Sequence, residues 1–464
     1  MIVIKFGGAA LGDADNFSNV AKCVERLKDR TPIVVVSAMK DVTCYLIEAI
    51  GYAEKRESQK AENLLETIGQ KHQEVIETLI LQQDRKSQAL DFLHEVLEEL
   101  QSICHGISAL KECTLKAQDY VLSFGEKLSA RVLAGVLTEV IQVQAIFGEE
   151  VIVTDDQFGS AYPRYELTQP KTQKRLLEVI DSGKIPLISG FTGATQKGET
   201  TTLGRGGTDF SASIIGSCMN VCEVWFMKEV DGIMSADPRV VQQARSIKMM
   251  NYREVAELSF FGAKVLHPTS IHPLKEKSIP ALIKNVYNPD FEGTRIHLDT
   301  EQRVKPGKAV TSIPDVSMIS VGGDGMMGIP GVAGRAFTSI ARAGVNILMI
   351  SQSCSEQSIC FAIKGEDRKA AIKALTQEFE LELLKEKIDE IEATDDVAIV
   401  CLVGAGMSGT PGVAGMLFST LGKEGINVMM IAQGSSEVNV SFLVEAKEAE
   451  RAIQCIHQAF GLGK

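Results

Sequence analysis

The sequence predicts an α/β fold in which a mostly parallel sheet is sandwiched by helices, followed by two small modules of related sequence. Strand-like and helix-like runs alternate over about the first 290 residues, which is typical of a parallel sheet covered on both faces. The final third of the chain then repeats itself at a fixed offset, which indicates a duplicated structural unit.

Length and composition indicate an ordinary soluble protein. The chain has 464 residues, of which 45% are hydrophobic, 23% charged and 6% aromatic, and this length allows about three domains. The formal charge is -12 and no block of like charge stands out, which excludes a nucleic-acid arm or a lipid-binding patch. We expect a small-molecule ligand, no nucleic-acid partner and no membrane.

The ten cysteines are spaced irregularly, with no CxxC and no histidine at metal-ligand spacing. They are therefore expected to be small core residues in a reducing compartment, and no metal-ligating residues are predicted. The opening MIVIKFGG is too short for a signal peptide, so the cytoplasm is the expected location.

The first part of the sequence predicts a βαβ unit followed by a helical hairpin. Short β-branched runs at Ile2–Phe6 and Ile33–Ser37 flank a helix-like segment at Asn16–Lys28, which predicts two parallel strands joined by a helix. From Ser58 to Leu110 apolar residues recur with helical spacing, which predicts two amphipathic helices.

Further strands are predicted at Val151–Val153, Ile185–Ser189 and Val221–Met227, with helices at 171–182 and 207–219. Ligands of such sheets bind at the carboxyl ends of the strands.

The repeat is the strongest internal signal. Residues 325–363 realign on 406–444 without a gap, an offset of 81 residues. Each copy reads strand, glycine-rich turn, helix, Gly-x-Asn turn, strand, hairpin and strand. The turn-rich stretch 287–308 is the expected connection between the sheet domain and the repeat.

Two glycine-rich segments are candidate anion sites. Lys5-Phe6-Gly7-Gly8 directly follows the first strand and precedes a helix, so backbone amides and an ammonium group meet there. The stretch 203–209 (LGRGGTD) combines three glycines with Arg205, Thr208 and Asp209, and arginine matches a carboxylate or phosphate with two parallel bonds. A tight turn and a flexible surface hairpin are the structural alternatives, and nothing matches GxxxxGK[ST].

Three further candidate site residues have simple structural explanations. Glu126 is expected to open a helix, where capping explains a carboxylate. Lys264 reads as a solvated cation, and His267, next to Pro268, as structural.

Taken together, these segments resemble a known family. KFGG, SFGEKLSARVLAG, GFTGATQKGETTTLGRGGTDFSA, VDGIMSADPRVV and ELSFFGAKVLHP occur in this order and look like aspartate kinase (aspartokinase) of the amino-acid-kinase superfamily, with tandem ACT domains. QSCSEQSICF, GVNILMISQ and the helical insertion resemble the kinase portion of bifunctional aspartate kinase–homoserine dehydrogenase. Since the sequence stops at Lys464, the resemblance implies a monofunctional form.

The resemblance also implies a domain division. Residues 1–295 would form a kinase domain of the amino-acid-kinase fold, with a helical insertion at about 58–112, and 296–312 a linker. Residues 313–392 and 393–464 would be two ferredoxin-like βαββαβ ACT domains.

The implied reaction transfers the γ-phosphoryl group of ATP to the β-carboxylate of L-aspartate. The product would be 4-phospho-L-aspartate, in the first step of lysine, threonine and methionine biosynthesis. Since a carboxylate nucleophile is already ionised at neutral pH, no general base is needed, and catalysis reduces to positioning and charge stabilisation. ATP and Mg2+ are expected, the metal being held chiefly by the ATP phosphates.

The resemblance assigns site residues by their positions in the family motifs. The expected catalytic residues are Lys5, Asp209 and Lys264. Glu126 would take the ammonium group of aspartate and Arg205 its α-carboxylate, and the expected substrate-binding set is Thr43, Glu126, Arg205, Gly206, Gly207 and Thr208. The expected ATP-binding set is Lys5, Gly7, Gly8, Lys228, Glu229, Met234, Arg239, Lys264 and Val265.

The sequence departs from the family pattern in two places. Ala9 and Ala10 stand where relatives usually have hydroxyl residues, and Lys228 and Met234 replace a threonine and a tyrosine near the expected ATP site. These changes put the affinity for ATP in doubt.

The duplicated tail implies an amino-acid effector, threonine first and lysine second. A site in at least one copy is expected, and the candidate residues are Met326, Gly331, Val332, Asn346, Ile347 and Gln352 in the first copy, and Gly412, Val413, Asn427, Val428 and Gln433 in the second. Pairing of ACT domains implies a homodimer or homotetramer.

Two alternatives stay open. One is another amino-acid kinase of the same fold, such as a glutamate or acetylglutamate kinase. The other is a non-catalytic amino-acid sensor whose kinase domain has decayed, which Ala9, Ala10 and Lys228 would support.

Overall fold

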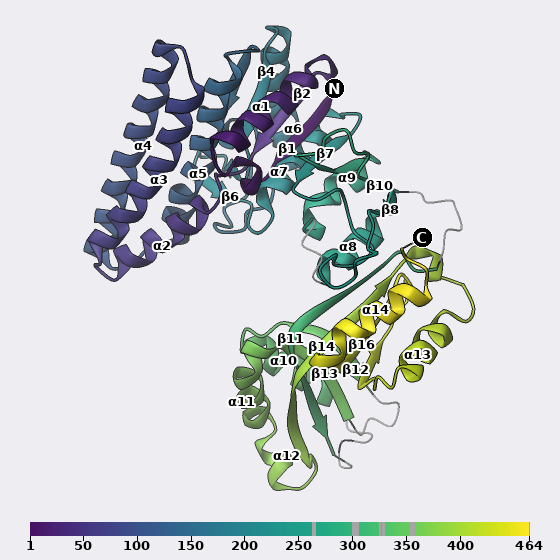
Figure 1. Cartoon of the computed structure of the whole chain (residues 1–464). Coiled ribbons are helices and arrows are strands. Elements are labelled where there is room, and N and C mark those ends of the chain that lie inside the picture. The colour runs from purple at the N-terminus through teal and green to yellow at the C-terminus, as the bar shows by residue number, and fades with distance from the viewer. Residues whose placement is uncertain (262–265, 299–305, 324–325, 327–329, 353–357, 464) are drawn as a thin grey trace. The chain divides into compact units, whose positions relative to one another are not determined.

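The computed structural model describes residues 1–261, 266–298, 306–323, 326, 330–352 and 358–463 (Figure 1). The chain forms two compact units. Unit 1 comprises Met1–Ile233, Ser246–Tyr252 and Val265–Thr300, and unit 2 comprises Met234–Arg245, Arg253–Lys264 and Glu301–Lys464.

Unit 1 is built on an eight-stranded sheet. In spatial order its strands are β3 (Val143–Ile146), β4 (Ile185–Ser189), β2 (Pro32–Val36), β1 (Ile2–Phe6), β7 (Val224–Lys228), β9 (Ala281–Asn285), β10 (Thr294–His297) and β8 (Met249–Asn251). Every neighbouring pair is parallel except β9 with β10. The prediction of a mostly parallel sheet is confirmed.

Helices cover both faces of this sheet. They are α1 (Ala14–Arg26), α2 (Val42–Glu54), α3 (Ser58–Leu79), α4 (Gln83–Leu110), α5 (Leu115–Leu137), α6 (Tyr165–Asp181), α7 (Gly207–Met219) and the short α9 (His272–Glu276). Ile4 and Phe6 of β1 pack into the core formed with α1 to α5. Because side chains alternate along a strand, Lys5 faces the opposite side, where α7 contacts β1.

The helical insertion consists of α3 and α4, which pack against each other and against α2 (Figure 1). A short antiparallel hairpin of β5 (Thr192–Ala194) and β6 (Thr200–Thr202) lies beside α5. This β5–β6 hairpin ends immediately before the glycine-rich stretch 203–209.

Four sequence-based assignments differ from the structure. The helix predicted at 171–182 begins at Tyr165 and ends at Asp181. Val151–Val153 is not a strand, because the chain turns at Gly148 and Val153 makes only an isolated bridge to Ala194. The strand in the sheet is β3 instead. The strand predicted from Val221 begins at Val224, since Asn220 ends α7 in a left-handed conformation. The turn-rich connection contains β10.

Unit 2 contains a six-stranded antiparallel sheet with two related halves. Its order is β12 (Ile347–Gln352), β13 (Ser358–Lys364), β11 (Ala309–Gly322), β14 (Glu390–Val403), β16 (Asn439–Glu445) and β15 (Met430–Ala432). The helices of the repeat are α10 (Val332–Arg342), α11 (Arg368–Glu378), α12 (Glu380–Leu384), α13 (Val413–Lys423) and α14 (Ala449–Ala459).

The two central strands are shared between the two copies of the repeat. The first part of β11, from Ala309, pairs with the end of β14, whereas its second part pairs with both β13 and the start of β14. The register shifts at the crossover, where Asp315 and Asp396 both have a positive φ. These aspartates are 81 residues apart, so the duplication includes the crossover. The expected linker 296–312 therefore contains the start of β11.

Unit 2 also includes α8 (Tyr252–Phe260), apart from its first residue. Glu254 of α8 is fully buried, lies 2.9 Å from the ammonium of Lys308 and accepts the Ala405 N–H. Asn439 of β16 donates to Glu257 of the same helix. The helix that precedes the segment containing Lys264 is thus bonded to the sheet of the repeat.

Within the described ranges, the structure has no helix whose length and apolar character would let it cross a bilayer.

Candidate active site

A polar cavity of about 450 Å3 lies at the carboxyl ends of β1 and β2 in unit 1. The N-termini of α2 and α7 open onto it, and helix N-termini favour anions through their free N–H groups. Its lining comprises Lys5, Gly8, Ala9, Ser37, Ala38, Met39, Lys40, Asp41, Thr43, Cys44, Glu126, Phe191, Gly204, Arg205, Gly206, Gly207, Thr208 and Asp209.

At the floor of the cavity two ammonium groups share one carboxylate. Lys5 Nζ lies 2.6 Å from Asp209 Oδ1, and Lys228 Nζ lies 3.2 Å from Asp209 Oδ2. Lys5 belongs to β1, Lys228 ends the neighbouring β7, and Asp209 occupies the first turn of α7. With two positive charges and one negative charge, this cluster has a net positive charge to offer an anion.

Burial and the neighbouring charges shift the pKa values of this cluster in opposite directions. Burial lowers the pKa of Lys5, and the attraction of Asp209 offsets this only in part. Burial also acts to raise the pKa of Asp209, but the two neighbouring ammonium groups outweigh it and lower the pKa overall. Asp209 is therefore an ionised carboxylate that fixes the direction in which Lys5 points.

Glu126 faces the same cavity from the middle of α5. The expectation that it opens a helix is wrong, because Thr114 caps α5 twelve residues earlier by accepting the Ala117 N–H. The preceding Gly125 lets α5 approach the loop after β2, since a Cβ there would lie 2.9 Å from Ala38 Cβ. Glu126 is only 3% exposed and its Oε2 has no hydrogen-bond partner.

The buried carboxyl of Glu126 is ready to receive a cation. Burial raises its pKa to about 8, against the smaller opposing effects of backbone N–H groups and of Lys5. An ammonium group at Oε2 would satisfy the unpartnered oxygen and favour the ionised form.

Arg205 is exposed at the rim, on a loop shaped by glycines. Gly206 has φ 74°, and a Cβ there would lie 2.8 Å from His267 Cβ, so both conformation and space require glycine. Gly206 also forms the N-cap of α7. The arginine and the amides at the start of α7 therefore line the same side of the cavity.

The structure brings most of the sequence-predicted site residues together. Those lining the cavity are Lys5, Gly8, Thr43, Glu126, Arg205, Gly206, Gly207, Thr208 and Asp209. Gly7 adjoins the Lys5 ammonium, Lys228 binds Asp209 and Glu229 is exposed beyond the end of β7.

The other four predicted nucleotide-binding residues are Met234, Arg239, Lys264 and Val265. Met234 and Arg239 belong to unit 2, where Arg239 is 2.6 Å from Asp237. Lys264 and Val265 lie outside the described residues.

The loop 37–41 and Phe191 also line the cavity but were not predicted from the sequence. Ser37 follows β2 as Gly7 follows β1, so the meeting of parallel strand ends could have indicated Ser37 to Asp41. Phe191 has a φ of 69°, which is unusual for a non-glycine residue and could not be read from sequence.

The predicted effector residues occupy equivalent places in the two halves of unit 2. Gly331 and Gly412 are the left-handed N-caps of α10 and α13. Asn346 and Asn427 are exposed just before β12 and β15. The other members at these turns and strands are Met326, Val332, Ile347, Gln352, Val413, Val428 and Gln433.

Among the described residues, no group of three or more His, Cys, Asp or Glu side chains is arranged to hold a metal ion.

Comparison with protein families matches residues 1–285 to the amino acid kinase family and residues 319–379 and 400–460 to the ACT domain. The bifunctional aspartokinase/homoserine dehydrogenase 1 of Arabidopsis thaliana is 33% identical over 469 residues, covering 100% of this chain and 51% of the relative. The chain therefore spans about half the length of the bifunctional relatives it matches. Aspartokinase 1 of the same plant is 32% identical, covering 99% of this chain and 80% of the relative.

Solved structures agree over the whole chain. E. coli aspartokinase III in complex with lysine and aspartate superposes with a TM-score of 0.82 at 28% identity, covering 99% of both chains. The aspartate kinase of Clostridium acetobutylicum gives a TM-score of 0.80 at 27% identity, again with 99% of both chains covered.

Glu126→Gln should change stability in a pH-dependent way. The pKa of this carboxyl is about 8 in the folded chain, against an ordinary 4.5, so the unfolded chain loses its proton first as pH rises. The wild type should therefore lose stability relative to the variant between pH 5 and pH 8, by at most about 1.4 kcal/mol per pH unit. Urea unfolding across this range measures the difference.

Glu48→Gln, at an exposed position of α2, is the control for removing a carboxylate. A difference between Glu126→Gln and the wild type that stays constant from pH 5 to pH 8 would show that Glu126 is not held protonated.

Proposed function

Because the chain belongs to the amino acid kinase family, we propose that it is an aspartate kinase, which transfers the γ-phosphoryl group of ATP to the β-carboxylate of L-aspartate. The observation that carries this proposal is the cavity with the Lys5–Asp209–Lys228 cluster at its floor, Glu126 on its wall and Arg205 at its rim. These groups complement an amino acid with an additional carboxylate together with a phosphoryl group.

Aspartate would be bound through both of its α-substituents. Its ammonium pairs with the unpartnered Oε2 of Glu126, and its α-carboxylate with the guanidinium of Arg205. Thr43, in the first turn of α2, and the amides at the start of α7 complete the contacts. The β-carboxylate is then directed toward the Lys5–Asp209–Lys228 cluster.

The chemical step needs charge stabilisation rather than a base. An oxygen of the β-carboxylate forms a bond to the γ-phosphorus as the bond from that phosphorus to the β,γ-bridging oxygen of ATP breaks, leaving 4-phospho-L-aspartate and ADP. Lys5 lies where negative charge builds up on the transferring group, and Asp209 holds it there. Gly7 and Gly8 offer backbone amides to the phosphates.

Lys228 fits this scheme as a second cation. Its charge is a departure from the family pattern that put the affinity for ATP in doubt, and its ammonium lies 3.2 Å from Asp209 Oδ2. We propose that Mg2+ enters the site with ATP, held chiefly by its phosphates. Lys264, Val265, Met234 and Arg239 stay proposed nucleotide-binding residues.

We also propose regulation by an amino acid, threonine before lysine, bound at the two Gly-x-Asn regions. Support comes from α8, which is bonded to the ACT sheet through Glu254 and Glu257 and leads into the segment with Lys264. A shift of that sheet would move α8 with it. E. coli aspartokinase III is described in complex with lysine.

A homodimer or homotetramer is proposed from apolar side chains exposed on the ACT sheet. Ile350 of β12 and Ile431 of β15 are 46% and 45% exposed at equivalent positions of the repeat, although β12 and β15 also contact each other within the chain. Exposed apolar side chains favour association with another copy.

The cytoplasm remains the proposed location. The support is indirect: the nine described cysteines are free, and Cys23, Cys104, Cys218 and Cys401 are buried. The Arabidopsis relatives are named as chloroplastic.

Purified protein with ATP, Mg2+ and aspartate should form an acyl phosphate that hydroxylamine traps as a hydroxamate. Arg205→Ala should raise the KM for aspartate by about 100-fold, because two charge-assisted hydrogen bonds are lost. The KM for ATP should change little.

A panel of glutamate, acetylglutamate and aspartate in the same assay tests the related kinases. A signal with another substrate but not with aspartate would contradict the proposal. Calorimetric binding of threonine without ATP binding would instead favour a non-catalytic sensor.

Threonine should lower the rate in this assay more than lysine does. Asn346→Ala or Asn427→Ala should raise the half-inhibiting concentration about tenfold, as expected for one lost hydrogen bond. Met416→Ala, at an exposed position of α13, is the control. If threonine, lysine and their mixture all leave rate and affinity unchanged, the regulatory proposal is wrong.

A further inference from the structure

Asp119 is a buried carboxylate in α5 that the proposed catalytic scheme does not use. It is 1% exposed and lies seven residues before Glu126. Seven residues make about two helical turns, so the two carboxylates are on nearly the same face of α5, about 10 Å apart along its axis.

Asp119 connects two separate segments to that helix. Its Oδ2 accepts the backbone N–H groups of Gly159 and Thr202, both at 2.9 Å, and its Oδ1 accepts the Thr202 hydroxyl at 2.6 Å. Thr202 is the last residue of β6, and its carbonyl accepts the Ala161 N–H at 2.8 Å. The carboxylate thus fixes both the end of β6 and the loop at Gly159.

Both fixed segments adjoin the Arg205 loop. Gly204 follows Thr202 by two residues and has φ 71°. A Cβ on Gly204 would lie 3.2 Å from Ser160 Cβ and 3.4 Å from the Gly159 carbonyl oxygen. The backbone that carries Arg205 is therefore held at Thr202 by Asp119. At Gly204 the same backbone packs against Gly159 and Ser160.

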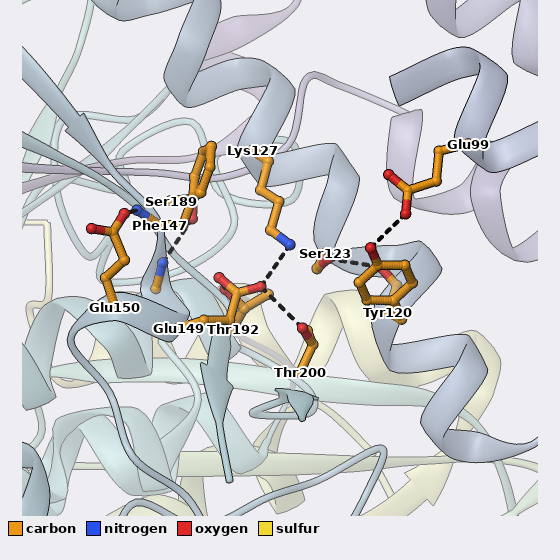
Figure 2. A network of polar contacts seen from close by, with 11 residues as sticks. Glu99, Tyr120, Ser123, Lys127, Phe147, Glu149, Glu150, Ser189, Thr192 and Thr200 are labelled. Carbon is orange, nitrogen blue, oxygen red and sulfur yellow. Dashed lines mark hydrogen bonds and ion pairs between the residues drawn. The ribbon is translucent and has the colours of Figure 1, made fainter. Parts of the chain in front are cut away.

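The β5–β6 hairpin is joined to α5 a second time, through Glu149. Lys127 Nζ lies 2.8 Å from Glu149 Oε1, and Thr192 and Thr200 donate to Glu149 at 3.2 and 3.5 Å. Figure 2 shows Lys127 reaching down from the helix to Glu149, with Thr192 and Thr200 beyond it. The hairpin is thus held at both strands and cannot pivot freely about the Asp119 contact.

We propose that Asp119 is a positioning residue that sets the distance between Glu126 and Arg205, and thereby the fit of the substrate's ammonium and α-carboxylate. This inference rests on the proposed function. One face of α5 carries the ammonium-binding carboxylate directly and fixes the carboxylate-binding arginine through Asp119 and Thr202.

The test compares three variants in the hydroxamate assay. Asp119→Ala removes all three hydrogen bonds and should raise the KM for aspartate at least tenfold, while kcat and the KM for ATP change less than threefold. Asp119→Asn should restore the KM to within about threefold, because its amide oxygen can accept both N–H groups while the Thr202 hydroxyl accepts from the amide nitrogen.

Lys116→Met is the matched control. Lys116 joins the same helix to the same hairpin through Glu199 at 2.7 Å, but this pair is exposed and lies at the hairpin tip. Its loss should leave all three kinetic constants unchanged. If Asp119→Ala does not fold, Thr202→Val removes the hydroxyl bond alone and should raise the aspartate KM by two- to fivefold.

The outcomes separate the inference from the proposed function. A purely structural role predicts that Asp119→Ala lowers the amount of active enzyme, and so kcat, with an unchanged aspartate KM. That result, or an Asp119→Asn variant as impaired as Asp119→Ala, overturns the inference. A wild type that forms no hydroxamate from aspartate overturns the proposed function itself.

Discussion

The shared ion pair between Asp209 and the two lysines is the interaction on which the site depends. Asp209 is in α7, Lys5 in β1 and Lys228 in β7, so one carboxylate joins a helix to two neighbouring strands. A buried carboxylate needs compensating charge or hydrogen bonds, and here two ammonium groups supply the charge. The excess positive charge that remains suits the proposed phosphoryl group, although the chain as a whole has a formal charge of -12.

The same arrangement explains why the groups that line the cavity come from such distant parts of the sequence. The carboxyl ends of parallel strands meet at one edge of the sheet, and the loops after β1 and β2 and the start of α7 converge there. Glu126 is the exception, since it reaches the cavity from the middle of a helix. Gly125 makes that possible by allowing α5 to pack closely against Ala38.

In unit 2 the duplicated sequence produces a single sheet rather than two independent ones. Each central strand crosses from one copy to the other at an aspartate with positive φ. Because β11 and β14 belong to both halves, the two copies of the repeat share one sheet. The bonds of Glu254 and Glu257 join α8 to that sheet.

Local sequence patterns predicted the elements that are long or strongly patterned. Ile2–Phe6 and Gly207–Met219 have the predicted bounds, because an apolar run and a small-residue helix are local signals. Val151–Val153 looks equally strand-like, but hydrogen bonding to Gly148 and Thr168 takes it out of the sheet. The sharing of β11 between the repeats depends on pairing with residues about 90 positions away, which no local pattern encodes.

The candidate site was predicted where motifs are continuous and missed where contacts are distant. KFGG and LGRGGTD each combine glycines with charged residues in one continuous stretch, so Lys5, Arg205 and Asp209 could be identified from sequence. Asp119 gives no such signal, because an aspartate within a helix is ordinarily a surface residue and its partners are 40 and 83 residues away. Phe191 depends on a backbone conformation that sequence does not reveal.

The proposed reaction depends on Lys5, held by Asp209, to stabilise the transferring phosphoryl group. The most direct test is the single-turnover rate of acyl-phosphate formation in Lys5→Met at saturating ATP and aspartate, with aspartate affinity measured separately by calorimetry. If Lys5 has this role, the rate should fall by about 100-fold or more with aspartate affinity nearly unchanged. An unchanged rate would show that Lys5 does not stabilise the transferring group.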